Sequence, residues 1–492
     1  MVNTFVTAAK NQANETVTEN KAPAFKSTLD TNLDFFAKSG NINYPALSVF
    51  KQAFAEDRDL AIRNLLHMRD VRNGKGIRDN ARAILRYLAD SYPDVITDNK
   101  IIQAFVQVGR WDDIFEVLHV SNKRPSNYVL NLIAEELQKP EPNGLLCKWL
   151  PRKMVKLNDR KSNFDIIPLL IQKRMNLTPK QYRQLLVKHT KVVETAMCAN
   201  NWSEIKYEHV PSKAHNIYKF AFKRHSPEQY TAYLNKVEKG EVKINATTLW
   251  PHEVIGPHGS MVTNKTAQAL WNALPNFMPE GVGILPVVDV SASMCQGIQG
   301  YPKYEAIDIS IAMGLYVASK NKSVFKDLFV TFHEKPSLVT LPKNATLETM
   351  YRATRSASWG GSTNLIASVK LILDLAIKNK VPQEDMPQAL LVLTDMQFNR
   401  GHSGMTSVQE IEHMYEQAGY KTPQFIWWNI CGGSRARVDQ APVPVTKDSS
   451  GCALVSGYSP AIIKAIFNVD FESFTPYNVM VETLKHSRYD WV

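Results

Sequence analysis

The sequence places carboxylates and hydroxyls at spacings that suit a hard metal ion. The hydrophobic run GILPVVD ends at Asp289, and Ser291 and Ser293 follow at alternate positions. Further along, Thr363 lies in the glycine-rich segment WGGSTNL, and Asp395 ends the hydrophobic run LVLTD. Hard divalent cations such as Mg²⁺ prefer oxygen ligands and keep water in part of their coordination shell. Two carboxylates and three hydroxyls would supply such oxygens and leave one position open.

The surroundings of this motif do not indicate catalysis. A phosphatase of the haloacid dehalogenase type would need a second aspartate in place of Ser291, and a metallohydrolase normally uses more carboxylates or histidines and a general base. The twelve histidines form no HExxH-like pair, and Cys295 has no histidine near it in the sequence. Gly74-Lys75-Gly76 lacks the GxxxxGK[ST] spacing of a phosphate loop and is predicted to be a turn between helices. We therefore expect a binding protein, not an enzyme, and a metal-dependent nuclease or phosphatase is the least favoured hypothesis.

Two plainer interpretations of the Asp289 motif stay open. Asp289 could end a strand while Ser291 and Ser293 cap the following helix. The site could also hold a metal for structural support alone, or be a vestige of a metal site.

Residues 276–492 must position these side chains, and they alternate short apolar runs with helical segments. The predicted strands are VGILPVVDV, DLFVTF, PSLVTL, QALLVLTDM, QFIWWNI and GCALVSGY. Apolar strands separated by helices predict an α/β domain with a mostly parallel sheet covered on both faces. Ligands of such Rossmann-like folds bind outside the carboxyl ends of the strands, where Asp289 and Asp395 stand.

The sequence before this domain has a helical pattern of apolar residues instead of short apolar runs. After a polar segment at residues 1–25, residues 26–275 contain one segment after another with apolar residues at three- and four-residue spacing. Examples are NARAILRYLADSY and TPKQYRQLLVKHTKVVETAMCA, the second with Thr178 as helix N-cap. We predict a multi-domain chain in which an α-helical, HEAT-like repeat array precedes the α/β domain.

The net charge of +11 is confined to the helical part. Residues 1–275 carry 39 Lys and Arg against 27 Asp and Glu, and residues 276–492 carry 19 against 20. Residues 151–225 alone hold 16 basic and 5 acidic side chains. Clustered cations attract phosphates, so a polyanion partner is predicted. The alternative is a solvated basic surface that keeps the protein in solution.

Composition also indicates the compartment. The five cysteines are widely scattered and form no CxxC pair, as expected in a reducing cytosol. No apolar run reaches the roughly 18 residues that a membrane helix needs. The polar N-terminus lacks the layout of a signal peptide. We expect a cytoplasmic monomer with no membrane partner.

Several stretches together resemble a known family. In order they are RNLLHMRDVRNGKG, GRWDDI, CKWLPRK, LTPKQYRQLL, NWSEIKYEHVPSKA, TLWPHEVI, VVDVSASM, WGGSTNL and VLTDMQF. They resemble uncharacterised proteins from viruses, bacteria and eukaryotes that join helical repeats to a von Willebrand factor A domain. The layout is similar to that of the Ro autoantigen (TROVE) family, whose A domain carries a very similar DVSASM.

The resemblance implies a metal-ion-dependent adhesion site. Ser291, Ser293 and Thr363 would be hydroxyl ligands of Mg²⁺ or another divalent cation, and Asp289 and Asp395 would act directly or through water. It further implies a ring of helical repeats, closed by the A domain, that binds small structured RNAs outside and single-stranded RNA ends inside.

Two functions follow as expectations. The first is a non-enzymatic, Ro-like RNA-binding protein with phosphate contacts on the helical domain. The second is a protein-interaction scaffold in which an acidic residue of a partner completes the metal shell. The RNA-contact candidates, chosen by local charge density alone, are Lys153, Lys156, Lys173, Arg174, Lys180, Arg183, Lys188, Lys191, Lys219, Lys223 and Arg224.

Overall fold

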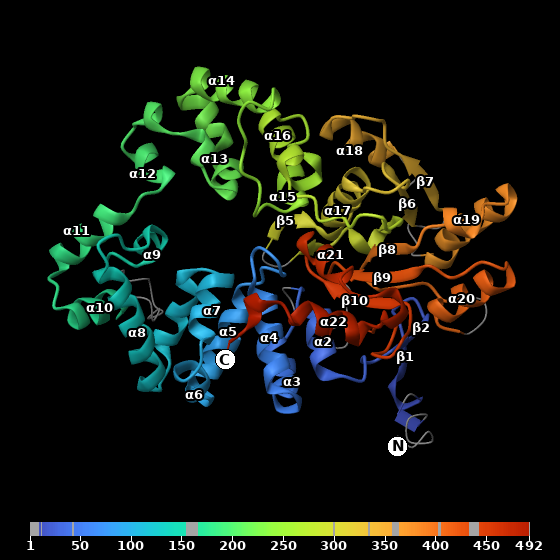
Figure 1. Ribbon diagram of the computed structural model, residues 1–492, viewed down its shortest axis with the longest axis horizontal. Coiled ribbons are helices and arrows are strands. Elements are labelled where there is room, and N and C mark those ends of the chain that lie inside the picture. Colours follow the sequence, from blue (N-terminus) through green and yellow to red (C-terminus); the bar gives the residue numbers. More distant parts are fainter. Residues whose placement is uncertain are drawn as a thin grey trace. The chain divides into compact units, whose positions relative to one another are not determined.

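The chain folds into two compact units, seen in Figure 1. The computed structural model describes residues 9–10, 12–41, 44–153, 166–298, 301–332, 335–356, 364–401, 405–431 and 442–491, with the backbone alone at 301 and 302. The sheet unit consists of residues 1–61, 73–75 and 246–485, and the helical unit of residues 62–72, 76–245 and 486–492. The chain is therefore multi-domain, with a helical part and an α/β part.

This division differs from the predicted boundaries after residues 25 and 275. Residues on both sides of each boundary pack in the sheet unit, and residues 486–492 belong to the helical unit. The physical reason is apolar burial, because Ala22 and Ala37 lie in the same hydrophobic cluster as the strands of the sheet. Such long-range packing leaves no periodic signal in the sequence.

A six-stranded sheet forms the centre of the sheet unit. Its strands are β3 (Ile284–Asp289), β6 (Leu328–Phe332), β7 (Ser337–Thr340), β8 (Ala389–Thr394), β9 (Gln424–Asn429) and β10 (Cys452–Ser456). The order is β10-β9-β8-β3-β6-β7, and all pairs are parallel except β6 with β7. Each predicted strand segment contains one of these strands, so the prediction of a mostly parallel sheet is confirmed.

Further elements complete the sheet unit. A hairpin of β1 (Glu15–Val17) and β2 (Pro23–Phe25) precedes α2 (Thr31–Lys38) and α3 (Ala46–Glu56). The others, with η for a 3-10 helix, are α15 (Pro251–Ile255), η5 (Pro257–Gly259), α16 (Lys265–Ala273), η6 (Ala292–Met294), β4 (Gly297–Ile298), β5 (Tyr301–Glu305), α17 (Ala306–Lys320), α18 (Leu347–Ser356), α19 (Leu365–Asn379), η7 (Gln383–Asp385), α20 (Ser407–Gln417), α21 (Ala461–Ile466), η9 (Phe471–Ser473) and α22 (Pro476–Leu484).

Helices cover both faces of the sheet. Helices α19 and α20 pack together over one face, where Val287 and Val392 join their hydrophobic cluster (Figure 1). Helix α17 packs on the other face, and it approaches β3 so closely that a Cβ on Gly314 would lie 2.5 Å from Val288 Cγ2. Strands buried on both faces need apolar residues at every position, which explains the continuous apolar runs of the sequence.

The helical unit is a succession of short helices, of which the first, α4, begins with residues 58–61 of the sheet unit. They are α4 (Arg58–Arg69), α5 (Asp79–Ser91), α6 (Pro93–Thr97), α7 (Ile101–Val108), η1 (Trp111–His119), α8 (Lys123–Gln138), α9 (Gly144–Trp149), α10 (Ile167–Met175), α11 (Pro179–His189), α12 (Val193–Cys198), η3 (Trp202–Glu204), η4 (Tyr207–His209), α13 (Ser212–His225), α14 (Pro227–Glu238) and η10 (Ser487–Tyr489). Throughout the described parts of the chain, we find no helix whose length and hydropathy would let it span a bilayer.

A buried ion network joins helices of this unit. Asp113 is fully buried, and its two carboxylate oxygens each lie 2.7 Å from a guanidinium nitrogen, one on Arg69 and one on Arg82. Near the C-terminus, Arg488 Nε lies 2.9 Å from Asp70 Oδ2. These pairs fix α4, α5, η1 and η10 to one another.

The helix predicted in the segment TPKQYRQLLVKHTKVVETAMCA, with Thr178 as its N-cap, is shorter than this segment. Thr178 is its N-cap and accepts a hydrogen bond from the Gln181 N–H at 3.3 Å, as predicted. The helix ends at His189, and a separate helix begins at Val193. The prediction of one continuous helix is wrong here, because β-branched residues dominate the junction and the Thr190 hydroxyl donates to a carbonyl one turn back at 2.6 Å.

Candidate metal centre and basic surface

The two acidic residues of the predicted metal site lie side by side at the sheet edge. Strands β3 and β8 are parallel neighbours, with Val288 opposite Leu393. Asp289 is the last residue of β3, and Asp395 directly follows β8. Both side chains are fully buried. The topology therefore brings together two carboxylates that are more than a hundred residues apart in the sequence.

Hydroxyl groups surround the Asp289 carboxylate. The Thr394 hydroxyl donates to Asp289 Oδ2 at 2.8 Å, and the Ser291 backbone N–H donates to Asp289 Oδ1 at 3.0 Å. The Ser291 and Ser293 Oγ atoms lie 3.0 Å apart. Ser291 is the N-cap of η6, but its side chain makes no capping hydrogen bond. Capping by Ser291 therefore does not explain the motif, and both hydroxyl oxygens face one another at the end of β3.

Asp395 contributes an oxygen without a partner. Its Oδ1 accepts a hydrogen bond from the Gln397 backbone N–H at 3.0 Å. Its Oδ2 is buried and has no hydrogen-bond partner among the described residues. A buried carboxylate oxygen without a donor is costly, so it is an available ligand for a cation.

The electrostatics of the pair also favour a cation. Burial and then the negative charge of Asp395 raise the pKa of Asp289 to about 7. Burial likewise raises the pKa of Asp395, and to a smaller extent the charge of Glu19 does, against the lowering effects of the Gln397 backbone N–H and the Ser293 side chain. No Lys, Arg or His in the described parts of the chain forms an ion pair with either carboxylate. A divalent cation would stabilise both ionised groups at once.

The donor set fits Mg²⁺ or a similar hard ion. Asp289, Asp395, Ser291 and Ser293 supply carboxylate and hydroxyl oxygens, whereas Thr363 lies outside the described residues. Among the side chains that the structure describes, no cluster of three or more His, Cys, Asp or Glu suits a metal. A metal at this centre would therefore need hydroxyl ligands as well as carboxylates.

Sequence reasoning missed the N-terminal segment beside this centre. The Thr18 hydroxyl donates to the Phe398 carbonyl at 2.7 Å, and the Glu19 backbone N–H donates to Gln397 Oε1 at 2.9 Å. Thr18 and Gln397 are buried, and Glu19 is exposed. The predicted polar segment therefore packs against the loop that carries Asp395, a contact between residues nearly four hundred positions apart.

Most of the predicted RNA-contact residues are exposed cations of the helical unit. Lysines and arginines lie on α10, on α11 and at the end of α13, and the exposed set is Lys153, Lys173, Arg174, Lys180, Arg183, Lys188, Lys191, Lys223 and Arg224. Lys191 Nζ lies 3.2 Å from Glu141 Oε2, and the others form no ion pair with a described residue. Lys156 lies outside the described residues.

Lys219 does not belong to this exposed set. It is 6% exposed, and its ammonium donates to the backbone carbonyl and side-chain oxygen of Asn216 at 3.0 and 2.8 Å. Burial lowers the pKa of Lys219 to about 8. Charge density alone selected it wrongly, because its position on α13 turns the side chain inward.

Two exposed aromatic rings lie among the cations, and charge density did not reveal them. Trp149 is 40% exposed, with the charged groups of Arg110 and Lys148 each 5.5 Å from its ring centroid. Phe220 is 52% exposed on α13. Packing within the protein therefore covers only part of the Trp149 side chain. Rings beside cations can stack on nucleic-acid bases.

Two family models match the chain. The model of a domain of unknown function (DUF2828) matches residues 18–143 and 169–274, and that of another domain of unknown function (DUF7788) matches residues 284–486. The first covers helices of both units, and the second contains the whole candidate metal centre.

Individual proteins are also similar to the chain. Uncharacterized protein L728 of Acanthamoeba polyphaga mimivirus is 30% identical over 532 residues, covering 96% of this chain and 88% of that protein. Among solved structures, proximal thread matrix protein 1 from the mussel byssus is 14% identical with a TM-score of 0.25, covering 41% of this chain and 48% of that one.

Proposed function

The chain belongs to the family of the uncharacterised mimivirus protein L728, and we propose that it is a non-enzymatic, Ro-like RNA-binding protein. In this proposal the helical unit is a HEAT-like array that contacts RNA phosphates. The sheet unit is a von Willebrand factor A-like domain with a Mg²⁺ site. The protein acts as a monomer in the cytoplasm. Ring closure, which the resemblance implies, stays a prediction.

The observation that carries the proposal is the unpaired basic surface of the helical unit. Lys180, Arg183 and Lys188 project from α11 without an ion pair to any described residue. Each phosphate that such a cation neutralises releases condensed counterions, which favours binding and makes it salt-dependent. A surface that served solubility alone would gain nothing from exposed aromatic rings nearby.

The rings of Trp149 and Phe220 extend the proposal to single-stranded segments. Backbone contacts by Lys and Arg do not read sequence, and aromatic stacking tolerates every base. The helical unit is thus suited to sequence-tolerant binding of unpaired RNA or to shape-based binding of folded RNA.

Mg²⁺ would be held by Asp289, Ser291, Ser293 and Asp395. When bound, it would neutralise two buried carboxylates and offer an open coordination position. The proposal assigns oxygen ligands to this site and no reaction.

A protein partner is the second candidate function. It is favoured by Asp395 Oδ2, which is buried and has no hydrogen-bond partner among the described residues. An acidic side chain of a partner would then complete the metal shell, with the helical unit as scaffold.

RNA titration at several salt concentrations tests the first proposal against the second. The test variant reverses three charges on α11, as Lys180→Glu, Arg183→Glu and Lys188→Glu. A matched control makes the same change in net charge at exposed lysines of the sheet unit, as Lys378→Glu, Lys421→Glu and Lys464→Glu. The proposal expects the α11 variant to lose most of its affinity and the control to keep it. Equal losses of RNA affinity in the two variants would show only a non-specific effect of net charge and would overturn the proposal.

A further inference from the structure

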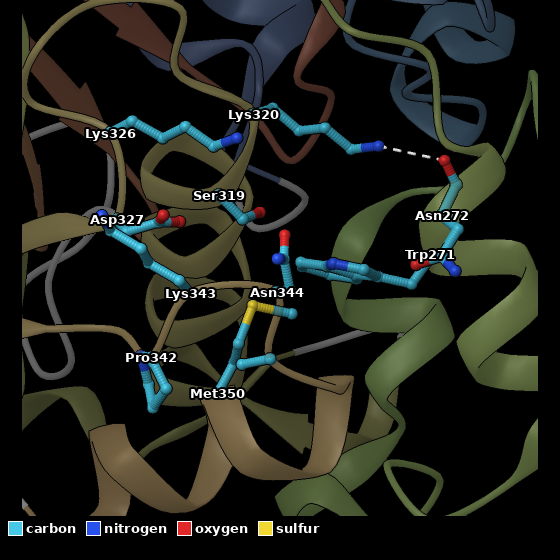
Figure 2. A pocket seen from close by; sticks show the side chains of 11 residues that line it. Trp271, Asn272, Ser319, Lys320, Lys326, Asp327, Pro342, Lys343, Asn344 and Met350 are labelled. Carbon is cyan, nitrogen blue, oxygen red and sulfur yellow. Dashed lines mark hydrogen bonds between the residues drawn. The ribbon is translucent and has the colours of Figure 1, made fainter.

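A polar pocket of about 370 Å³ lies in the sheet unit, away from the candidate metal residues. Its wall combines the ends of α16 and α17, the loop before β6, the loop after β7 and one residue of α18 (Figure 2). The volume falls within the range of small-molecule sites, about 300–1,000 Å³. The pocket is lined by Trp271, Asn272, Ser319, Lys320, Lys326, Asp327, Pro342, Lys343, Asn344, Ala345 and Met350.

The pocket carries an excess of positive charge. Lys320, Lys326 and Lys343 line it, and Asp327 is the one carboxylate among its described lining residues. Among the described residues, none of the three lysines has an acidic partner within ion-pair distance. Figure 2 shows Lys320 and Lys326 along the same edge of the pocket. Burial and then the charge of Lys326 lower the pKa of Lys320, as expected for neighbouring ammonium groups.

Part of this arrangement has a structural role. The Lys320 ammonium donates to the Asn272 carbonyl at 3.1 Å and so ties α17 to α16, as the dashed line in Figure 2 shows. Lys326 and Lys343 make no such hydrogen bond within the described parts of the chain. Two ammonium groups are therefore free to bind an anion.

The remaining polar groups of the pocket indicate which class of ligand it can bind. The Asn272 and Asn344 amides and the Ser319 hydroxyl can donate to phosphate oxygens. An ionised Asp327 accepts hydrogen bonds only, so the ligand must also offer a donor such as a hydroxyl. Trp271 is 2% exposed, which leaves little ring surface for stacking on a base. Recognition would therefore rest on phosphate and hydroxyl groups.

We propose that this pocket binds a phosphate ester that also carries hydroxyl groups, as a sugar phosphate does. Lys326 and Lys343 bind the phosphate, and Asp327 accepts from a hydroxyl. The ester can come from a free small molecule or from the 5′-phosphate end of an RNA. Because the pocket belongs to the sheet unit, the proposal stands apart from RNA binding by α11.

Calorimetry on the full chain tests the proposal with ribose 5-phosphate, ribose and inorganic phosphate as probes. We expect ribose 5-phosphate to bind at least tenfold more tightly than ribose. The variant Lys326→Glu/Lys343→Glu should weaken that binding at least tenfold, whereas Lys378→Glu/Lys421→Glu should leave it unchanged. A milder pair, Lys326→Gln/Lys343→Gln, serves if charge reversal disturbs folding.

Substitution of Asp327 gives a second test, in which the affinities for the two phosphate probes should change in opposite directions. Its φ of 65° lies in the left-handed region that Asn also tolerates, so Asp327→Asn should fold normally. The variant should bind ribose 5-phosphate more weakly and inorganic phosphate more tightly, because it loses an acceptor and a repulsive charge together. A merely structural role for Asp327 would move both affinities in the same direction.

Two RNA oligonucleotides, with a 5′-phosphate and with a 5′-hydroxyl, identify the source of the ester. A preference for the 5′-phosphate that disappears in the Lys326/Lys343 variant assigns the pocket to RNA ends. Binding of ribose 5-phosphate without such a preference assigns it to a free metabolite. Absence of binding by both probes, or binding that ignores the Lys326/Lys343 variant, overturns the proposal. The α11 variant should still bind ribose 5-phosphate, so the two proposals fail independently.

Discussion

Asp289 ends β3 and Asp395 directly follows the neighbouring parallel strand β8, both side chains are fully buried, and the negative charge of Asp395 raises the pKa of Asp289. No described cation offsets this effect within the protein. In the proposed function, a divalent ion bound by the pair would stabilise the fold.

Removing the charge of Asp289 should abolish the stabilisation by metal without destabilising the metal-free protein. Since the pKa of Asp289 is raised by burial and by Asp395, its ionised form destabilises the metal-free fold at pH 8. Asp289→Asn should therefore be at least as stable as the wild type without metal. Thermal unfolding with and without Mg²⁺ checks this, with a metal-induced rise in Tm expected in the wild type alone. A rise of the same size in the variant would contradict the assignment of this site.

Stacking and charge should have different signatures in RNA binding. Trp149→Ala and Phe220→Ala should each weaken binding of single-stranded RNA by about 1–3 kcal/mol per base that the ring stacks on. The slope of log K against log salt should stay unchanged, because no phosphate contact is lost. Fluorescence anisotropy at several salt concentrations measures both quantities. A change of slope without loss of affinity at low salt would exclude stacking.

The buried network around Asp113 should stabilise the helical unit strongly. Asp113→Ala leaves Arg69, which is itself almost fully buried, without its carboxylate. Breaking such a buried pair costs about 3–5 kcal/mol of unfolding free energy. Urea denaturation measures the loss. The exposed pairs of Arg124 with Asp94 and Asp98 are a matched control, where Arg124→Ala should cost less than about 1 kcal/mol.

His215 should make the helical unit sensitive to mild acid. It is fully buried, its Nε2 lies 2.9 Å from the Tyr207 carbonyl oxygen, and burial lowers its pKa to about 4. Because the unfolded chain binds the proton first, stability is complete above about pH 6.5 and decreases as the pH falls toward 4.

The variant His215→Gln isolates this effect. It keeps a side-chain donor for the Tyr207 carbonyl but does not titrate. The free energy of unfolding should depend less on pH between 6.5 and 4 in the variant, and denaturant titrations at several pH values measure this. Identical pH profiles for the two proteins would show that His215 is not the sensitive group.

The strands and the acidic pair were predictable because local signals determine them. Apolar runs that stop abruptly at Asp289 and Asp395 mark buried strands, and parallel pairing then brings both strand ends to one edge. The N-cap at Thr178 was predictable for the same reason, since Gln181 follows three residues later.

Contacts between distant segments could not be read in the same way. Thr18 meets Phe398, and Arg488 meets Asp70, through hydrogen bonds that leave no local pattern. The burial of Lys219 is likewise decided by how α13 packs, which charge density cannot show. Residues that depend on tertiary packing were therefore missed or misassigned, whereas residues fixed by a strand end or a helix cap were found.

The salt dependence of RNA binding tests the central claim most directly. Nucleic-acid-free protein is titrated with structured and single-stranded RNA from about 50 to 300 mM salt. The account predicts micromolar or tighter binding at low salt and a steep salt slope. It also predicts a loss of both in Lys180→Glu/Arg183→Glu/Lys188→Glu but not in Lys378→Glu/Lys421→Glu/Lys464→Glu. Absence of binding by the wild type even at the lowest salt would contradict it, and would leave the acidic partner at Asp289 and Asp395 as the surviving function.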